Sequence, residues 1–190
     1  MNNSATQNEQ HDILVVDDTL VNLQLLTDIL TTHGYQVRPA LNAKLALQSV
    51  NVRIPDLVLL DVKMPDIDGY EICRRLKANE RTRSIPVIFI SALDDVTDKV
   101  EGFRVGGVDY ITKPFSKDEV LARVRNHLQL RELTENLEKR IQGRTQELLN
   151  TNVQLQHEVN VRKSTEEALR KINRAYKALS DCEQALIYAT

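Results

Sequence analysis

The chain has 190 residues, 27% of them charged, and its 25 Lys and Arg against 27 Asp and Glu leave a formal net charge of -2. This balance predicts no direct binding to nucleic acid or to an anionic membrane. No apolar run reaches the roughly 18 residues that a membrane span needs, and the polar residues 1–10 do not resemble a secretory signal. We therefore expect a cytoplasmic protein with a flexible arm over residues 1–10, followed by folded parts.

Five short apolar runs alternate with helical stretches between residues 11 and 130. The expected strands are 13–16, 35–37, 57–60, 86–90 and 109–111, and the expected helices are 19–33, 42–50, 69–78, 95–105 and a last one from Ser116. This alternation requires right-handed crossovers and a parallel sheet that is covered on both faces. The sequence therefore predicts an α/β, doubly wound (βα)5 domain.

Local signals support individual helices of this domain. In the first helix, Val21, Leu25, Leu26 and Ile29 form one apolar stripe that we expect to face the core. Asp68 with Glu71, and Ser116 with Glu119, have the spacing of capping boxes at helix starts.

Polar residues follow the apolar strands at their carboxyl ends, which is where open α/β sheets bind ligands. We expect them to gather at one edge of the sheet: Asp17, Asp18, Asp61, Ser91 and Lys113. Each residue alone has an ordinary explanation, such as a helix cap, a turn hydroxyl or a surface lysine. Only the five residues together indicate a functional site.

Three carboxylates brought together repel one another, and a divalent cation would remove that repulsion. Oxygen ligands of this kind suit Mg²⁺, with Mn²⁺ as an alternative. A cation, a lysine and a hydroxyl around one carboxylate could stabilise a phosphoryl group in transfer. Asp61, at the end of the buried run 57–60, is then the expected nucleophile and would form an acyl phosphate.

Four segments, 15–18, 61–69, 91–92 and 110–115, resemble in order and spacing the receiver domain of two-component response regulators. The resemblance covers residues 11–130 and implies a flavodoxin-like fold. It implies that Asp61 is the phosphoacceptor and that Lys113 contacts the phosphoryl group, with a cis bond before Pro114. It also implies a switch pair, Ser91 and Tyr110, in which the hydroxyl moves to the phosphate and the ring turns inward.

The same resemblance implies a Mg²⁺ site and a set of partners. The implied ligands are Asp18 and Asp61, Asp17 through water, and the backbone carbonyl of Lys63. The implied phosphodonor is a sensor histidine kinase or a phosphotransfer protein. Members of the family often dimerise through the surface of the fourth helix, fifth strand and fifth helix.

After Pro114 the chain contains one glycine, Gly143, and no proline, which predicts a long helix. A heptad line, Ile141, Leu148, Leu155, Arg162, Leu169 and Tyr176, favours a parallel two-stranded coiled coil with weak points. The alternative is one amphipathic helix that folds back on the domain or frays. We assign 131–179 to a dimerising coiled-coil linker and 180–190 to the start of a downstream segment that resembles the entry helix of a GAF or PAS domain.

We therefore expect a non-enzymatic phosphoacceptor that signals through its last helix to an output domain beyond residue 190. Two alternatives remain open at this point. One is a Mg²⁺-dependent phosphatase that also uses an aspartyl phosphate, although Lys63 occupies the place of its usual general acid. The other is a structural coiled-coil adaptor that is never phosphorylated.

Overall fold

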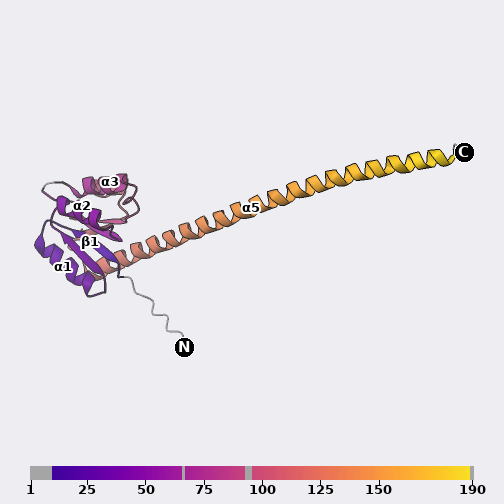
Figure 1. Ribbon diagram of the computed structural model, residues 1–190. Helices are drawn as coiled ribbons and strands as arrows, with labels where there is room; N and C mark the ends of the chain where they lie inside the picture. The colour runs from indigo at the N-terminus through magenta and orange to yellow at the C-terminus, as the bar shows by residue number, and fades with distance from the viewer. Residues whose placement is uncertain (1–9, 66, 93–95, 189–190) are drawn as a thin grey trace, which may run out of the picture. The chain divides into compact units, whose positions relative to one another are not determined.

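The computed structural model describes residues 10–65, 67–92 and 96–188, with backbone only for 96–99 and 178–188. The predicted arm therefore lies, except for Gln10, outside the described residues. The elements are these, in chain order (Figure 1): β1 (Asp12–Val16), α1 (Leu20–Thr31), β2 (Gln36–Ala40), α2 (Ala43–Val52), β3 (Leu57–Asp61), α3 (Gly69–Ala78), β4 (Val87–Ala92), α4 (Val96–Arg104), β5 (Asp109–Lys113) and α5 (Lys117–Tyr188).

All strand pairs are parallel, and the strand order is β2-β1-β3-β4-β5. This confirms the expected (βα)5 doubly wound, flavodoxin-like sheet, and the last helix is very long. Strand β2 is longer than expected and includes Pro39, which pairs with Val15. Proline lacks the backbone donor of a central strand and is tolerated here because β2 lies at the edge.

Alternate residues of the strands build one core cluster on each face of the sheet. Successive side chains of a strand point to opposite faces, so Ile13 and Val15 enter one cluster while Leu14 and Val16 enter the other. Side chains of α1 and α5 complete the first cluster, and side chains of α2 and α3 complete the second. Both faces of the sheet are therefore covered, and its strand ends are left for polar groups.

The two predicted capping boxes form in their N-cap half. The Asp68 carboxylate accepts from the Glu71 amide at 2.7 Å, and the Ser116 hydroxyl accepts from the Glu119 amide at 3.2 Å. The two glutamate side chains accept from arginines of their own helices.

The phase of the predicted α1 stripe was partly wrong. In α1 the buried residues are Leu23, Leu26, Ile29 and Leu30, whereas Val21 and Leu25 are 70% and 47% exposed. Because apolar residues also lie outside the core face of α1, its sequence does not fix which side faces the sheet.

The chain forms two compact units, Met1–Thr134 and Glu135–Thr190. In the first unit, polar contacts hold α5 against the sheet. Asp109 of β5 accepts from Arg123 at 2.6 Å and contacts His127 at 3.0 Å, and Arg131 donates to the Asp56 carbonyl at 2.7 Å. None of the helices in the described parts of the chain is long and apolar enough to cross a membrane.

Two helical glycines, one in each compact unit, allow a matched test of how tightly each unit is packed. A Cβ at Gly143 would meet no atom within 4 Å, whereas a Cβ at Gly102 would overlap the Tyr110 hydroxyl. Since alanine favours helix by about 1 kcal/mol over glycine, we expect Gly143→Ala to raise the melting temperature of α5. We expect Gly102→Ala to destabilise the first unit by about 1–3 kcal/mol through overpacking. Thermal unfolding followed by circular dichroism would measure both; equal effects of the same sign would contradict the packing described.

Candidate functional site at the carboxyl edge of the sheet

The structure brings three carboxylates together at the carboxyl ends of β1 and β3. Asp17, Asp18 and Asp61 each offer one oxygen that lies within 4.8 Å of the other two. Asp17 and Asp61 are buried and Asp18 is exposed, so the cluster opens to solvent on one side. The convergence of these residues at one edge was expected, because the carboxyl ends of parallel strands meet there.

Lys113, at the end of β5, lies between the two buried carboxylates. Its Nζ is 2.9 Å from Asp17 Oδ2 and 3.1 Å from Asp61 Oδ2. The peptide bond from Lys113 to Pro114 is cis, as expected. The lysine thus connects the first, third and fifth strands through charge at a single point.

Two further residues hold Asp17 in place, and the sequence analysis did not identify them. The Thr19 amide donates to Asp17 Oδ1 at 2.8 Å, and the Asn22 side chain donates to Oδ1 and Oδ2 at 3.1 and 3.0 Å. Asn22 lies on the first turn of α1, five residues after Asp17, and that spacing could have indicated the contact. Asp17 is therefore positioned by its neighbours and by Lys113.

The charges at this edge do not balance, and the pKa values reflect this. Burial raises the pKa of Asp61 above 3.8, Lys113 offsets part of that effect, and Asp17 and Asp18 add to it by repulsion. Burial alone would lower the pKa of Lys113, but its hydrogen bond to Asp17 and its proximity to Asp61 raise the pKa above 10.5. Lys113 therefore stays charged while the cluster keeps an excess of negative charge.

The loop after Asp61 turns sharply and closes on the strand end. The Gly69 amide donates to the Val62 carbonyl at 2.9 Å, and a Cβ at Gly69 would overlap the Asp61 carbonyl oxygen. Only glycine allows this approach. The loop borders an open groove of about 440 Å³ whose walls include Asp18, Lys63 and Asp68. The groove leaves room beside the carboxylates for a small ligand.

Ser91 and Tyr110 lie on adjacent strands, in different environments. The buried Ser91 hydroxyl donates to the Ala92 carbonyl at 3.3 Å, and its backbone position pairs with Thr112 of β5. The Tyr110 ring is 5% exposed and packs against Phe89 and Phe103, with ring centroids 5.3 and 5.4 Å apart. The Tyr110 ring therefore lies inward, between these two aromatic rings.

Small residues make room for these aromatic rings. Gly102 of α4 faces the Tyr110 ring, and a Cβ at Gly107 would overlap Phe89. From the sequence, Gly106 and Gly107 are expected only to end the helix 95–105, and no pattern points to Gly102. The need for glycine at both positions comes from tertiary contacts with the aromatic rings, and no local sequence pattern indicates it.

The donor set at this edge fits a hard divalent cation. It supplies three carboxylates, one of them exposed beside an open groove, against the single charge of Lys113. Mg²⁺ prefers one or two carboxylates and retains several waters, so an open acidic site of this kind suits it. Mn²⁺ has the same ligand preference.

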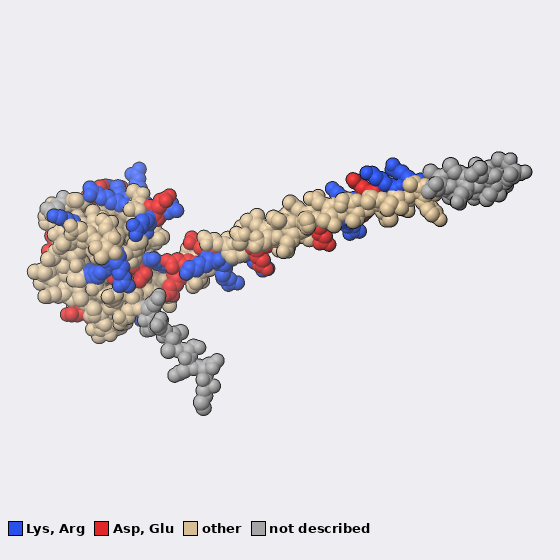
Figure 2. All heavy atoms as spheres, in the orientation of Figure 1, with Lys and Arg blue, Asp and Glu red and all other residues tan. Residues whose placement is uncertain are grey.

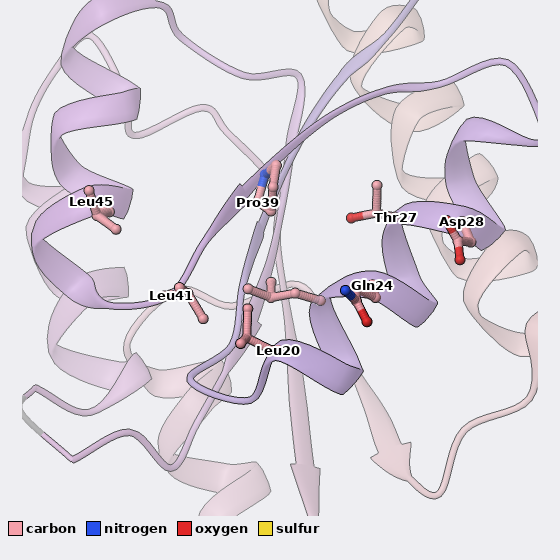
Figure 3. A pocket seen from close by; sticks show the side chains of 8 residues that line it. Leu20, Gln24, Thr27, Asp28, Pro39, Leu41 and Leu45 are labelled. Atoms are coloured by element: carbon pink, nitrogen blue, oxygen red, sulfur yellow. The ribbon is translucent and has the colours of Figure 1, made fainter.

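An apolar groove of about 300 Å³ lies next to this edge, between α1 and α2 (Figure 3). Leu20, Leu41 and Leu45 line it together with Pro39, and Gln24, Thr27 and Asp28 form its polar border. Its first lining residue in the chain, Leu20, follows Asp18 by two positions. Leu20 and Val21, on the first turn of α1, are 60% and 70% exposed.

The fold and this edge define a class of protein: a flavodoxin-like (βα)5 domain with an acidic cluster and a lysine at the carboxyl ends of its strands. Residues 13–125 match the response regulator receiver domain family. The chain therefore belongs to that family.

The chain is similar to a response regulator and to a transcriptional regulator among curated proteins. The response regulator PleD of Caulobacter vibrioides is 41% identical over 128 residues, which are 67% of this chain and 28% of PleD. The DNA-binding dual master transcriptional regulator RpaA of Synechocystis is 42% identical over 114 residues, 60% of this chain and 47% of RpaA. The chain thus spans about half or less of the length of these two relatives.

Solved structures agree on the domain. The receiver domain of NtrX from Brucella abortus is 33% identical, with a TM-score of 0.59, over 62% of this chain and 98% of that chain. The signal receiver domain of a signal transduction histidine kinase from Syntrophus aciditrophicus is 36% identical, with a TM-score of 0.59, over 63% of this chain and 90% of that chain. Both likenesses concern the receiver part of the chain.

The excess negative charge should be measurable as a stability effect. Asp61→Asn removes a buried charge and leaves the pair of Lys113 and Asp17 intact. At neutral pH, with divalent ions chelated, we expect the free energy of unfolding to rise by more than about 0.5 kcal/mol, which exceeds the usual effect of a surface substitution. Because folding raises this pKa, the gain should be complete above the folded-state pKa and fade as the pH falls toward 3.8.

Urea titration of the two proteins would measure this difference. Glu80→Gln, which neutralises an exposed carboxylate, should stay within about 0.5 kcal/mol of the wild type. Added Mg²⁺ should reduce the difference in free energy of unfolding between the wild type and Asp61→Asn, because the ion relieves the same repulsion between carboxylates. A less stable Asp61→Asn protein in the absence of divalent ions would contradict the charge imbalance.

Proposed function

We propose that this chain is the phosphoacceptor receiver of a two-component phosphorelay and that Asp61 is the residue phosphorylated. The observation that supports this most is the pairing of Asp61 with Lys113 inside an open acidic cluster. Such a carboxylate belongs to a cluster that opens to solvent at Asp18, lies close to a permanent cation and is held at the end of a strand. The phosphodonor would be a sensor histidine kinase or a phosphotransfer protein.

In the proposed reaction, an Asp61 carboxylate oxygen attacks the phosphorus of a phosphohistidine on the donor. The new O–P bond forms as the N–P bond breaks, and the imidazole takes up a proton. Lys113, held charged by its two carboxylates, neutralises phosphoryl oxygens as negative charge spreads over them. Asp17 keeps Lys113 in place during the transfer, because their contact at 2.9 Å does not depend on Asp61.

Asp18 and Asp61, with Asp17 through water and the Lys63 carbonyl, would hold Mg²⁺, or Mn²⁺ in its place. When bound, the ion supplies charge stabilisation of the phosphoryl oxygens. The exposure of Asp18 and the groove beside Lys63 favour an exchangeable ion.

The phosphoryl group adds about -1.5 to -2 charge and three acceptor oxygens. We infer that the Ser91 hydroxyl leaves the Ala92 carbonyl to donate to one of them, and that the aromatic cluster around Tyr110 responds. The tight fit between Tyr110 and Gly102 supports this, because any movement of the ring must move α4. The fourth helix, fifth strand and fifth helix would then form the surface that changes.

The signal would leave through α5 to an output domain beyond residue 190, with two copies of the chain joined through their helices. The domain boundaries belong to this proposal: arm 1–10, receiver 11–130, coiled-coil linker 131–179 and downstream segment 180–190. The matched residues cover 28% of PleD and 47% of RpaA. No direct nucleic-acid binding is proposed for these residues.

The acceptor claim has a direct test by intact-mass measurement. With Mg²⁺ and acetyl phosphate, the wild type should gain the mass of one phosphoryl group, because a small donor needs only the acceptor, the ion and Lys113. Asp61→Asn should gain none, and Asp68→Asn, which keeps a capping side chain at the start of α3, should behave like the wild type. The same mass gain in Asp61→Asn would refute the assignment, and sustained hydrolysis of phosphate monoesters would favour the phosphatase alternative.

We further propose that the donor protein docks on the outward side of α1. Leu20 and Val21 are exposed directly beside the acidic cluster, and the apolar groove of Figure 3 continues from Leu20 toward α2. A helical phosphohistidine donor seated there would bring its imidazole to the carboxyl edge of the sheet. The exposure of Val21, which a core position would not have, supports this surface.

A charge on this surface should separate docking from chemistry. We expect Val21→Asp to slow transfer from an autophosphorylated sensor histidine kinase by at least about tenfold, which corresponds to 1.4 kcal/mol. Labelling by acetyl phosphate should not change, because the acceptor site is intact. Val52→Asp, at an 88% exposed position at the end of α2, is the matched control and should leave both rates unchanged. Equal slowing by the two variants would exclude α1 as the docking surface.

A further inference from the structure

The second unit, from Glu135 onward, presents apolar side chains along a single helix. The six most regularly placed are 50% to 75% exposed: Ile141, Leu148, Leu155, Val159, Leu169 and Tyr176. In proteins, most of the stability of a helix comes from packing of its apolar face against other structure. We therefore expect these side chains to pack against a partner along the length of the helix.

The spacing of these residues defines a seam with alternating steps of three and four. The heptad line from Ile141 to Tyr176 takes the d positions. The residues between them, at a positions, are Thr145, Asn152, Val159, Glu166 and Asn173. Polar residues thus occupy most of the a line, which weakens the seam but makes it selective.

We propose that two copies of this chain pair along this seam as a parallel, in-register coiled coil, and that Asn152 and Asn173 set the register. This inference rests on the homodimer of the proposed function and specifies its geometry. In register, each asparagine faces its own counterpart, and the two amides can exchange hydrogen bonds. A slip of one heptad would put one Asn152 opposite Thr145 and the other opposite Val159, so that neither amide meets its counterpart.

Charges beside the seam favour the parallel orientation. The e positions of three successive heptads are basic: Lys163, Arg170 and Lys177. An antiparallel pair would bring the two basic rows together, whereas a parallel pair places e positions beside g positions of the other chain. Glu158 at g then lies opposite Lys163 of the second copy. Figure 2 shows acidic and basic side chains interspersed along the described part of this helix.

Two consecutive layers of the seam carry charge instead of apolar side chains. Arg162 at d forms an ion pair with Glu166 at a, with Nε and Oε1 3.5 Å apart. Ser164 and Thr165 between them donate back to the Val161 carbonyl at 2.8 and 3.1 Å. In register, two arginines would meet in one layer and two glutamates in the next, so the charges balance only across both layers. These layers weaken the seam locally.

Cysteine cross-linking of the full-length chain tests this geometry. On a Cys182→Ser background, Leu148→Cys and Leu169→Cys should each form disulfide-linked homodimers. The controls Asn150→Cys and Lys171→Cys, at outward f positions, should cross-link at least about tenfold less. A mixture of the Leu148→Cys and Leu169→Cys chains should give no disulfide between positions 148 and 169.

Three outcomes would overturn the proposal: cross-links between positions 148 and 169, equal cross-linking at seam and control positions, or a monomer by light scattering. The register role of asparagine has its own test. Asn152→Val should raise the melting temperature but broaden the cross-linking pattern or the range of oligomers, whereas Asn150→Val should change neither. An Asn152→Val protein with an unchanged single register would remove that role.

These outcomes are independent of phosphorylation. Cross-linking at positions 148 and 169 should appear in Asp61→Asn as well. If the wild type also fails to take up phosphate, the acceptor assignment fails and the coiled coil stands. If phosphate uptake is normal and the seam cross-links are missing, only the geometry proposed here is wrong.

Discussion

The contact of Lys113 with Asp17 and Asp61 is the interaction on which the site depends. It joins the ends of three strands that are far apart in sequence, and it places a permanent cation against a buried carboxylate. Burial raises the pKa of Asp61, and repulsion from Asp17 and Asp18 adds to that effect. One lysine does not balance three carboxylates, so under the proposed function a divalent cation would neutralise the remaining charge.

The fold and much of this edge could be predicted from the sequence for a simple physical reason. Buried parallel strands are short continuous apolar runs, and the polar residue after each run must reach solvent at the same edge. Asp61 after Leu57–Leu60 and Lys113 after the fifth run follow this rule. The N-cap hydrogen bonds of α3 and α5 are equally local, since donor and acceptor lie three residues apart.

What could not be predicted depends on contacts across the fold. Val21 and Leu25 have the spacing of a core stripe, yet Leu23, Leu26 and Leu30 pack against the sheet, because a helix with apolar residues beyond one face can pack in more than one rotation. Gly102 appears in the sequence as a helix-weakening residue, and only the Tyr110 ring beside it shows why a side chain is excluded. The contact of Gly102 with the Tyr110 ring also joins α4 to β5, the strand that ends at Lys113.

The central claim is that the acidic edge stores a phosphoryl group on one residue, Asp61. Trapping the acyl phosphate measures this most directly: the phosphorylated chain is reduced with borohydride, which converts a phosphorylated aspartate to homoserine, and its peptides are sequenced by mass spectrometry. The account predicts homoserine at position 61 alone. Homoserine at position 17 or 18, or at none of the three, would contradict it.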